Sequence, residues 1–485
     1  MSGPYATLAS VTDVRPPSTR GGAPATVLTA DDLTRLTGGR LIRRSLQPIR
    51  GGAVDSREVT PGRLFVALPG ERTDGHRFLG EAVARGAAAL IVTREPEGVM
   101  AAADVTIVRV PDGLAALGAV AAGWRTRFSP LVAGVTGSIA KTSTKEAVAT
   151  VLARRFRTLR SEGNRNNEIG LPLTLLELDP EHEAVVLEMG MYVGGEIADL
   201  ARIARPRIGV VTAVQPVHLS RIGSIEAIER AKAELVEALA PDGTAVLNAD
   251  DPRVRAMADR TAADVVTYGF AADADVGADD VASAGLAGMQ FTLRTVRGRH
   301  PVAIPTLGRL AVHNALAAVA VGLAAGLSIG EIAAGLADGW AAPHRSEVVR
   351  LSGVTIVDDS YNASPTSVAA ALELLSGLPG RRVAVLGEML ELGEGHEAGH
   401  RAVGAAAAAV ADLLVVVGRP AAGIAAAARE IGLDPARVIE APDRETALDA
   451  LLPRLGHGDV VLVKASRGAA LDLLVDALRA ELAGR

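Results

Sequence analysis

The chain has 485 residues, of which 49% are hydrophobic and 22% charged, and a formal net charge of −6 at pH 7. This composition is typical of a globular protein of about two to four domains; it excludes a disordered chain and a surface that attracts nucleic acid in general. Cysteine is absent, which excludes disulfides, thiolate metal sites and cysteine nucleophiles. Because the chain has no secretion signal and no long apolar run, we expect a cytoplasmic protein without a membrane segment.

The first part of the chain predicts a tail followed by a small domain. Residues 1–26 are rich in Pro, Gly, Ser and Thr and predict a flexible tail. From 27 to 129, short apolar runs such as "RLFVALPG", "AAALIVT" and "VTIVRVP" alternate with helical patterns. This alternation predicts a small α/β domain.

Two further alternating series follow, at residues 130–342 and 343–485. The first contains the apolar runs "LVAGVT", "AVVLEMG", "RIGVVTAV" and "TAVLNAD", and the second contains "RRVAVLGEM", "LLVVVG" and "DVVLVKAS". Strands that alternate with helices predict a parallel sheet covered on both faces. We therefore predict an α/β fold of three consecutive domains, with a central P-loop ATPase-like parallel sheet and a C-terminal Rossmann-like domain.

The segment "GVTGSIAKTSTKE", residues 134–146, follows a predicted strand and opens a predicted helix. Its backbone amides would donate to phosphate, Lys141 would reach the outer phosphates, and the Thr142 hydroxyl would ligate Mg²⁺. Two features depart from the standard pattern: Gly134 lies seven residues before Lys141, and Ala140 replaces the last glycine. An ordinary strand–turn–helix corner is the alternative. The predicted nucleotide-binding residues are Gly134, Gly137, Ser138, Lys141, Thr142 and Ser143.

Two further strand ends carry side chains that ligate metals. Glu188 ends one apolar run, and His218 follows the end of the next predicted strand. A carboxylate beside a phosphate loop is suited to Mg²⁺, whereas a surface carboxylate and a structural histidine are the alternatives. Lys232 lies on the following predicted helix. Helical periodicity alone favours a solvated lysine there, paired with Glu229 one turn earlier.

Three other polar segments have open interpretations. Asn166 and Asn167 lie in a Gly-flanked loop, where a structural turn and a polar ligand site are equally supported. Asp358 and Asp359 follow a predicted strand and suit a turn or a helix N-cap. Arg345 lies at the predicted boundary near residue 343, either as a solvated surface arginine or as a cation that reaches a phosphate on the neighbouring domain.

Taken together, the motifs resemble those of the Mur ligase family, the ATP-dependent amide-forming enzymes of peptidoglycan precursor synthesis. The resemblance runs from about residue 27 to the C-terminus. It is carried by "DSREVTPGRLFVALPGERTDGHRF", "NRNNEIGLPLTLL", "LEMGMYVGGEIADLARIARP", "DDSYNASPTSVAAAL", "VAVLGEMLELGEGHEAGH" and "LVKASRG". Within the family, these motifs are most similar to the branch that joins D-alanyl-D-alanine to UDP-N-acetylmuramoyl-tripeptide.

The resemblance implies an enzyme that forms an acyl phosphate from ATP and converts it to an amide, releasing ADP and phosphate. It implies ATP and two Mg²⁺ ions, small-molecule substrates, no nucleic-acid or membrane partner, and a monomer. By this resemblance, ATP and Mg²⁺ would be bound by Lys141 and Thr142, and the metal ligands would be Glu188, His218 and a CO₂-carbamylated Lys232. The adenine would be contacted by Asn314, and ATP would be contacted from the C-terminal domain by Arg345 and Asp359. The muramyl substrate would be contacted by Asn166 and Asn167, and the uridine would be bound by Asp55, Ser56 and Arg57.

Some positions depart from the family pattern. If position 140 needs a positive φ, alanine there costs about 1–2 kcal/mol. Because the chemistry-bearing residues are retained, we expect a working ligase. The alternatives are a Mur-type ligase with a different amine substrate and a non-catalytic protein that binds UDP-muramyl peptides, which Ala140 favours. The other departures are Ala213 for Asn, Gln215 for Gly, Leu310 for His, Ala311 for Asn and Ser364 for Asn.

Overall fold

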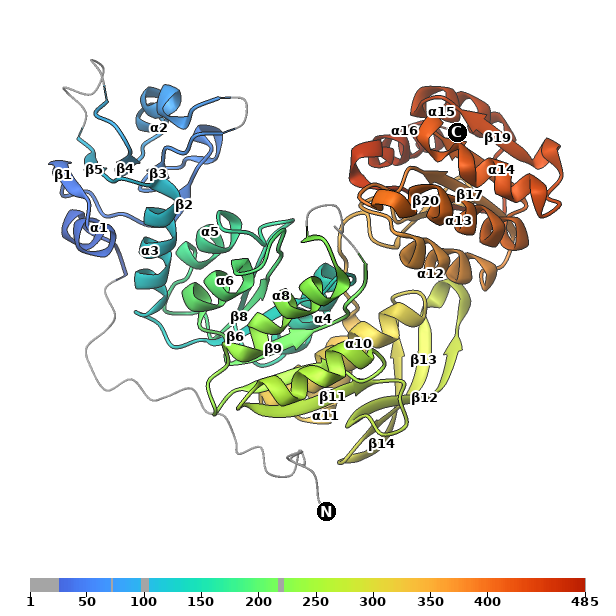
Figure 1. Cartoon of the computed structure of the whole chain (residues 1–485), viewed down its shortest axis with the longest axis horizontal. Helices are drawn as coiled ribbons and strands as arrows, with labels where there is room; N and C mark the ends of the chain where they lie inside the picture. Colours follow the sequence, from blue (N-terminus) through green and yellow to red (C-terminus); the bar gives the residue numbers. More distant parts are fainter. Residues whose placement is uncertain (1–25, 71–72, 97–103, 217–221, 485) are drawn as a thin grey trace.

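The structure, a computed structural model, describes residues 26–70, 73–96, 104–216 and 222–484. Almost all of the predicted tail, and His218, lie outside these residues. Three mixed sheets follow one another along the chain, each with its own helices (Figure 1). The predicted α/β fold with three successive units is confirmed, and the predicted limits at 129 and 343 fall between the sheets.

The N-terminal domain is a five-stranded sheet in the order β1-β5-β4-β3-β2. Its strands are parallel except β1, which pairs antiparallel with β5. The three apolar runs quoted above form β3, β4 and β5. The elements are α1 (Ala30–Thr37), β1 (Arg40–Arg43), β2 (Gly52–Ala53), β3 (Leu64–Val66), α2 (Leu79–Ala84), β4 (Ala89–Val92), β5 (Thr106–Arg109) and α3 (Gly113–Arg125).

Asp32 ties the start of α1 to the end of α3. It forms a capping box with Thr29 and an ion pair with Arg127 at 2.6 Å. Burial opposes ionisation of Asp32, but hydrogen bonds from Arg127, Thr29 and Arg35 outweigh it and lower the pKa to about 2. Because the pKa is lower in the folded protein, this stabilisation is present above about pH 4 and is lost as the pH falls towards 2.

We therefore expect Asp32→Asn to lower the free energy of unfolding by on the order of 2 kcal/mol at pH 7. The difference from the wild type should shrink as the pH falls from about 4 to 2. Urea unfolding of both proteins at several pH values measures this. Asp31→Asn is the control, because Asp31 is an exposed neighbour paired with Arg44. An equal loss in the control would contradict the assignment to Asp32.

The N-terminal and central domains share one hydrophobic core. Buried side chains of both domains, such as Val120 of α3 and Leu187 of the central sheet, belong to the same apolar cluster. The Trp124 indole donates to the Leu178 carbonyl at 3.1 Å, and Arg63 forms an ion pair with Glu177 across the junction. These two domains are therefore packed as one body.

The central sheet has nine strands in the order β14-β13-β12-β11-β10-β9-β6-β8-β7. Strands β6 to β12 are parallel, but β13 and β14 add an antiparallel extension. The expectation of a wholly parallel sheet is thus wrong at this edge. Only two residues separate β13 from β14, and such a short connection permits an antiparallel pair alone. The strands are β6 (Leu131–Thr136), β7 (Thr158–Arg160), β8 (Ala184–Glu188), β9 (Ile208–Val211), β10 (Thr244–Asn248), β11 (Asp264–Gly269), β12 (Val276–Ser283), β13 (Met289–Thr295) and β14 (Gly298–Ile304).

Helices cover both faces of this sheet, as predicted. One face packs under α4, α10 and α11, and the other under α5, α6 and α8. Val148, Val151 and Leu152, an apolar stripe on α4, are buried in the first of these layers. The helices are α4 (Lys141–Leu152), α5 (Gly170–Leu176), α6 (Glu196–Ala204), α8 (Ile225–Glu237), α9 (Pro252–Arg255), α10 (Arg309–Ala324) and α11 (Ile329–Asp338).

The C-terminal domain has a six-stranded sheet in the order β15-β16-β20-β17-β18-β19, with only β15 antiparallel. Apolar layers lie on both of its faces. No helix among the described residues is long and apolar enough to span a bilayer. The elements are β15 (Glu347–Leu351), β16 (Val354–Asp358), α12 (Pro365–Ser376), β17 (Arg381–Gly387), α13 (His396–Val410), β18 (Leu413–Val417), α14 (Ala422–Glu430), β19 (Val438–Ala441), α15 (Arg444–Leu451), β20 (Asp459–Lys464) and α16 (Leu471–Ala483).

Candidate active site

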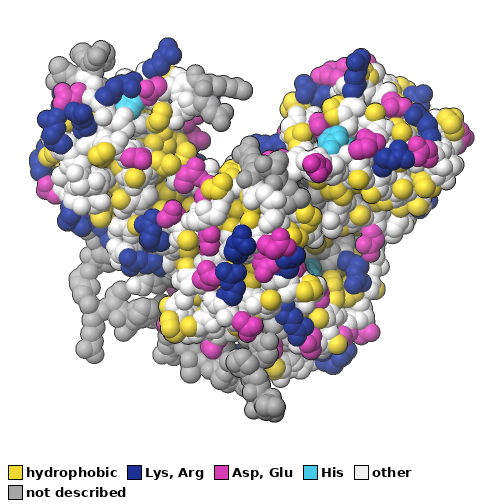
Figure 2. Space-filling view, viewed as in Figure 1, with side chains coloured by type: hydrophobic (Ala, Val, Ile, Leu, Met, Phe, Trp, Pro, Cys, Tyr) yellow, Lys and Arg dark blue, Asp and Glu magenta, His cyan; other side chains and the backbone are white. Residues whose placement is uncertain are grey.

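A cleft of about 720 Å³ lies between the central and C-terminal domains, at the carboxyl ends of β6 and β8. The N-terminal and C-terminal domains stand apart on either side of the central domain (Figure 2). The cleft is lined by the start of α4 and α10 on one side and by the segment after β16 and the end of β20 on the other. This is the edge at which parallel sheets bind ligands.

The loop before α4 is held by the segment that follows β9. The Ser138 amide donates to the Ala213 carbonyl at 2.8 Å, and the Gln215 amide donates to Ser138 Oγ at 2.8 Å. A side chain at Gly137 would bring its Cβ within 1.8 Å of Thr212 Oγ1, so only glycine fits there. Gly134, by contrast, lies inside β6 beneath α8 and is not part of the loop.

Ala140 has a left-handed backbone, with φ 63° and ψ 0°, at the N-cap of α4. Position 140 therefore does require a positive φ, and it is a position where the family has glycine. Alanine in this conformation costs about 1–2 kcal/mol, but the loop and helix still form around it.

We expect Ala140→Gly to raise the free energy of unfolding of the central domain by up to about 1 kcal/mol. The relief of strain, about 1–2 kcal/mol, exceeds the roughly 0.5–1 kcal/mol that the freedom of glycine costs. Guanidinium denaturation of the two proteins measures the difference. In Ala149→Gly, inside the same helix, the same change should be destabilising by about 1 kcal/mol. A similar loss at both positions would contradict strain at Ala140.

Lys141, Thr142, Glu188 and Asn166 meet at the start of α4. Thr142 Oγ1 donates to Glu188 Oε2 at 2.7 Å, and Asn166 Nδ2 donates to Glu188 Oε1 at 2.8 Å. Glu188 is only 3% exposed, so the surface-carboxylate alternative is wrong. Lys141 Nζ donates to the Gly137 carbonyl at 2.8 Å. Burial lowers the pKa of Lys141, Glu188 opposes this and Arg345 adds to it.

Lys232 lies on α8 and is 3% exposed. Its ammonium has no hydrogen bond or ion pair with another described residue. Glu229, its expected partner, instead binds Arg253 of α9 at 2.6 Å. The paired surface lysine expected from periodicity is therefore wrong. Burial, together with repulsion from Lys141, brings the pKa of Lys232 well below its usual value and favours the neutral amine.

The two asparagines of the loop before α5 have different roles in the structure. Asn166 lines the cleft and binds Glu188, whereas Asn167 Oδ1 accepts from the Gly170 amide at 2.9 Å and from the Ile169 amide, which fixes the start of α5. Asn314 of α10 is buried at the cleft wall, and its Oδ1 accepts from Thr144 Oγ1 at 3.1 Å.

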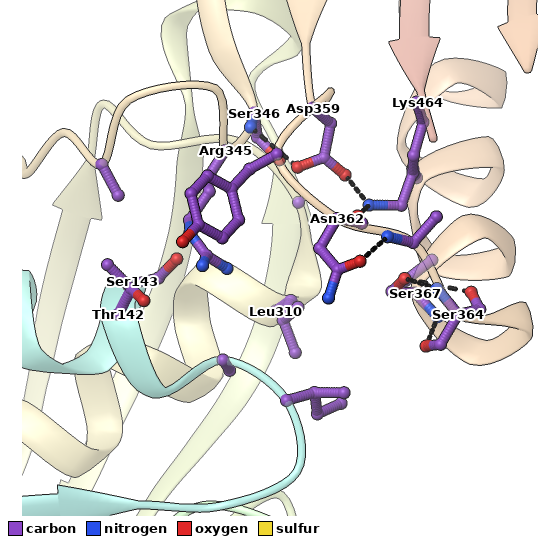
Figure 3. A pocket seen from close by; sticks show the side chains of 18 of the residues that line it. Thr142, Ser143, Leu310, Arg345, Ser346, Asp359, Asn362, Ser364, Ser367 and Lys464 are labelled. Atoms are coloured by element: carbon purple, nitrogen blue, oxygen red, sulfur yellow. Dashed lines mark hydrogen bonds and ion pairs between the residues drawn. The ribbon is translucent and has the colours of Figure 1, made fainter. Parts of the chain in front are cut away.

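Arg345 enters the cleft from the strap, the connecting segment between α11 and β15. Figure 3 shows it between Thr142 and Ser143 at the start of α4 and Asp359 of the C-terminal domain. Its guanidinium lies 4.1 Å from the centre of the Tyr361 ring. The residues on either side of it, His344 and Ser346, both have positive φ. The solvated surface arginine is therefore excluded.

Asp359 also lines the cleft, but as part of a polar cluster. Its Oδ1 accepts from the Ser346 amide at 3.0 Å and its Oδ2 pairs with Lys464 Nζ at 2.6 Å. Asp358 is fully buried and accepts from Ser360. Neither aspartate is the N-cap of α12, which is Ser364.

The predicted uridine-binding residues lie on the N-terminal domain, after β2. Asp55 caps a short helical turn (Ser56–Glu58) and forms an ion pair with Arg57 at 2.5 Å, and Ser56 donates to Glu81. The adjacent Glu58 binds Arg165 of the Asn166 loop at 3.2 Å. This stretch therefore faces the loop that reaches Glu188.

At three departures from the family pattern, Ala213, Gln215 and Ser364, the contacts in the structure do not require the family's side chain. Ala213 and Gln215 hold the phosphate loop through their backbones, so their side chains are not needed for those contacts. Ser364 caps α12 with a capping box, a role that serine and asparagine fill equally well. Leu310 is 39% exposed at the cleft wall, one turn before Asn314, and Ala311 is buried.

Sequence reasoning assigned no role to two cleft residues of the C-terminal domain, Lys464 and Arg467, although their motif was noted. Lys464 ends β20 and binds Asp359 and the Asn362 carbonyl, and Arg467 donates to the Tyr361 hydroxyl at 3.1 Å. The position of Lys464 at a strand end is the signal that would have indicated it.

Comparisons with known proteins agree with this geometry. Three family profiles match the chain: "Mur ligase family, catalytic domain" at residues 48–125, "Mur ligase middle domain" at 135–322 and "Mur ligase, glutamate ligase domain" at 344–467. The UDP-N-acetylmuramoyl-tripeptide--D-alanyl-D-alanine ligases of Mycobacterium tuberculosis and Escherichia coli are similar to it. The first is 41% identical over 88% of this chain and 91% of the relative, and the second 36% identical over 93% and 98%.

Two solved structures are similar over most of their length. MurF from Acinetobacter baumannii has a TM-score of 0.83 and 30% identity, and the match covers 94% of this chain and 99% of that one. MurF ligase from Thermotoga maritima in complex with ADP has a TM-score of 0.78 and 31% identity, covering 89% and 98%. Profiles, relatives and fold all lead to one conclusion: this chain belongs to the Mur ligase family.

Proposed function

We propose that this protein is an ATP-dependent ligase that joins D-alanyl-D-alanine to UDP-N-acetylmuramoyl-tripeptide in peptidoglycan precursor synthesis. The observation that carries the proposal is the buried Glu188, which is bound by Thr142 of the phosphate loop and by Asn166 of the neighbouring loop. Glu188 would be a metal ligand that lies between the predicted nucleotide and muramyl sites. Relatives that carry this enzyme's name cover most of the chain.

ATP would lie along the start of α4. Gly137, Ser138 and Lys141 would surround the phosphates. Asn314 binds Thr144 through its amide oxygen, so its amide nitrogen would contact the adenine. That the similar Thermotoga maritima enzyme was solved in complex with ADP supports nucleotide binding by this protein. Arg345 and Asp359 would approach the same nucleotide from the C-terminal domain, which makes their contribution depend on domain closure.

The donor set at Glu188 fits Mg²⁺. A carboxylate and a hydroxyl, both oxygen donors, converge there, and a hard cation prefers oxygen. Thr142 and Glu188 would hold one ion; His218 would contribute as a further ligand. Mg²⁺ in this position would offset negative charge that develops on the transferred phosphoryl group.

Lys232 would serve a second Mg²⁺ ion as a carbamate. Its amine would add to the carbon of CO₂ and release a proton, which converts a buried cation into an anionic oxygen ligand. Only the neutral amine can react in this way, and the environment of Lys232 favours that form. Carbamylation also accounts for a lysine that is buried without a carboxylate partner among the residues that the structure describes.

The reaction would occur in two steps. The terminal carboxylate of the tripeptide attacks the γ-phosphorus of ATP, an O–P bond forms and ADP leaves. The amine of D-alanyl-D-alanine then attacks the acyl carbon, a C–N bond forms, the amine loses a proton and phosphate leaves. Lys141, anchored by the Gly137 carbonyl, would stabilise charge on the phosphoryl oxygens without having to reorganise.

Phosphate release by the full-length protein tests this proposal. With Mg-ATP and UDP-N-acetylmuramoyl-tripeptide, release should depend on D-alanyl-D-alanine and match formation of the pentapeptide product. Release with single amino acids instead would identify a Mur-type ligase for a different amine. Release only after Ala140→Gly would show that the loop is disabled, and binding of the UDP-muramyl peptide with no release in either protein would establish the non-catalytic alternative.

A further inference from the structure

A second cavity, of about 770 Å³, opens at the opposite edge of the central sheet. It is lined by the residues at which strands begin, such as Leu131 of β6 and Arg207 just before β9, and by the connector 126–130 between α3 and β6. The candidate active site lies at the carboxyl ends of these strands, and the two cavities share no lining residue. The volume is within the range of ligand pockets, about 300–1,000 Å³.

The cavity has an excess of positive charge. Of its four arginines, Arg207 pairs with Asp242 at 3.1 Å and Arg202 pairs with Asp199 at 2.8 Å. Arg125 and Arg205 have no carboxylate partner among the described residues. The cavity's other carboxylate, Glu183, is exposed and accepts from the Arg157 amide. Two arginines close to one another are thus left without a counter-charge.

Arg125 is held rigidly in this position. Its Nε donates to the Ala204 carbonyl at 3.2 Å and its Nη1 to the Phe128 carbonyl at 2.9 Å. Burial, and then repulsion from Arg205, lower the pKa of Arg125 to about 10. Its remaining N–H groups have no protein partner in the described parts of the chain. A fixed guanidinium of this kind suits a carboxylate or phosphate.

Arg205 occupies a costly backbone conformation. It caps the end of α6 in the left-handed region, with φ 49°, where glycine is the usual residue. A non-glycine residue is strained in that conformation. Its side chain is exposed at the cavity rather than engaged with the helix. This strained position therefore carries a cation close to Arg125.

The rest of the cavity is largely apolar. Phe128, Leu131 and Phe156 line it, together with two prolines, Pro130 and Pro206. Phe128 is fixed by an edge-to-face contact with Trp124, whose ring centre is 5.0 Å away. An apolar wall beside two unpaired cations is complementary to a molecule that is apolar at one end and anionic at the other.

We propose that this cavity is a binding site for a small organic anion, whose carboxylate or phosphate is held by Arg125 and Arg205 and whose apolar body lies against Phe128 and Leu131. Such a ligand would contact the connector 126–130 and the first residues of the central strands together. This site is separate in position from the proposed ATP and muramyl sites.

Calorimetric titration of the full-length protein with phenyl phosphate tests the proposal, with Mg²⁺ and a non-hydrolysable ATP analogue present to fill the active-site cleft. We expect saturable binding at one site. Arg205→Asn should weaken it roughly tenfold or more, because a charge-assisted contact is lost while asparagine tolerates the left-handed backbone. Arg260→Gln, which removes an exposed arginine of the same domain paired with Glu237, should bind as the wild type does.

Three further probes define the ligand. Phenol and inorganic phosphate each lack one half of the recognised molecule and should bind at least tenfold more weakly. Comparison of benzoate with phenyl phosphate distinguishes carboxylate from phosphate as the preferred group. The proposal is overturned if neither phenyl phosphate nor benzoate shows saturable binding, or if their affinities are unchanged in Arg205→Asn.

Discussion

Replacing Lys232 with alanine is expected to lower kcat for amide formation by roughly a thousandfold, the scale on which loss of preorganised charge stabilisation slows an enzyme. Lys232 is buried beside Lys141 and has no carboxylate partner among the described residues. Without the proposed carbamate, the phosphoryl group would lose one of the two proposed Mg²⁺ sites. Steady-state phosphate release, with both substrates saturating, measures the effect.

Chemical rescue distinguishes the carbamate from a structural lysine. A short carboxylic acid added with bicarbonate should restore part of the activity of Lys232→Ala, because it returns a carboxylate to the vacated space. Arg230→Ala is the matched control: Arg230 is exposed on the same helix and should be dispensable. Wild-type activity in Lys232→Ala would end the carbamate hypothesis, and loss of folding in circular dichroism would assign the lysine a structural role.

Replacing Lys141 with methionine should have an effect of similar size, roughly a thousandfold in kcat. Methionine keeps most of the side-chain volume but removes the charge that faces the phosphoryl group as it transfers. Because this interaction is strongest in the transition state, kcat should fall much more than the affinity for ATP. Initial rates and calorimetric titration with ADP measure the two quantities separately.

The control for Lys141 is Arg154→Gln, just beyond the other end of α4. Arg154 is on the surface, where it pairs with Asp338, and its replacement should leave kcat within about twofold. A decrease of less than tenfold in Lys141→Met would be incompatible with the role proposed for the lysine. Equal losses in kcat and ADP affinity would instead indicate that Lys141 contributes uniformly to nucleotide binding.

The parts of the site that the sequence predicted are those set by local rules. Glu188 follows an apolar strand and Thr142 opens a helix after another, and parallel strands must bring such ends to the same edge. For Ala140 sequence reasoning set only a condition, the cost of a positive φ, and the structure supplied the φ itself. These predictions needed no knowledge of which distant segments pack together.

The parts that sequence reasoning missed depend on long-range packing. Periodicity paired Lys232 with Glu229, but Arg253 from the next helix binds Glu229 and leaves the lysine in the interior. Arg345 could not be distinguished from a surface arginine until the C-terminal domain placed Tyr361 against it. The antiparallel edge of the central sheet was missed because the strands β12 to β14 are only partly buried and lack the continuous apolar runs of the inner strands.

The core that the N-terminal domain shares with the central domain determines how many rigid bodies can move relative to one another in the enzyme. Because residues of both domains are buried in one apolar cluster, separating them would expose hydrocarbon to water. The C-terminal domain is attached instead through the strap around Arg345, with a few apolar contacts such as Leu307. We therefore expect the N-terminal and central domains to move as one rigid body and the C-terminal domain to move against them. Substrate binding to the rigid body and the approach of Arg345 with the C-terminal domain would then be separate events in the catalytic cycle.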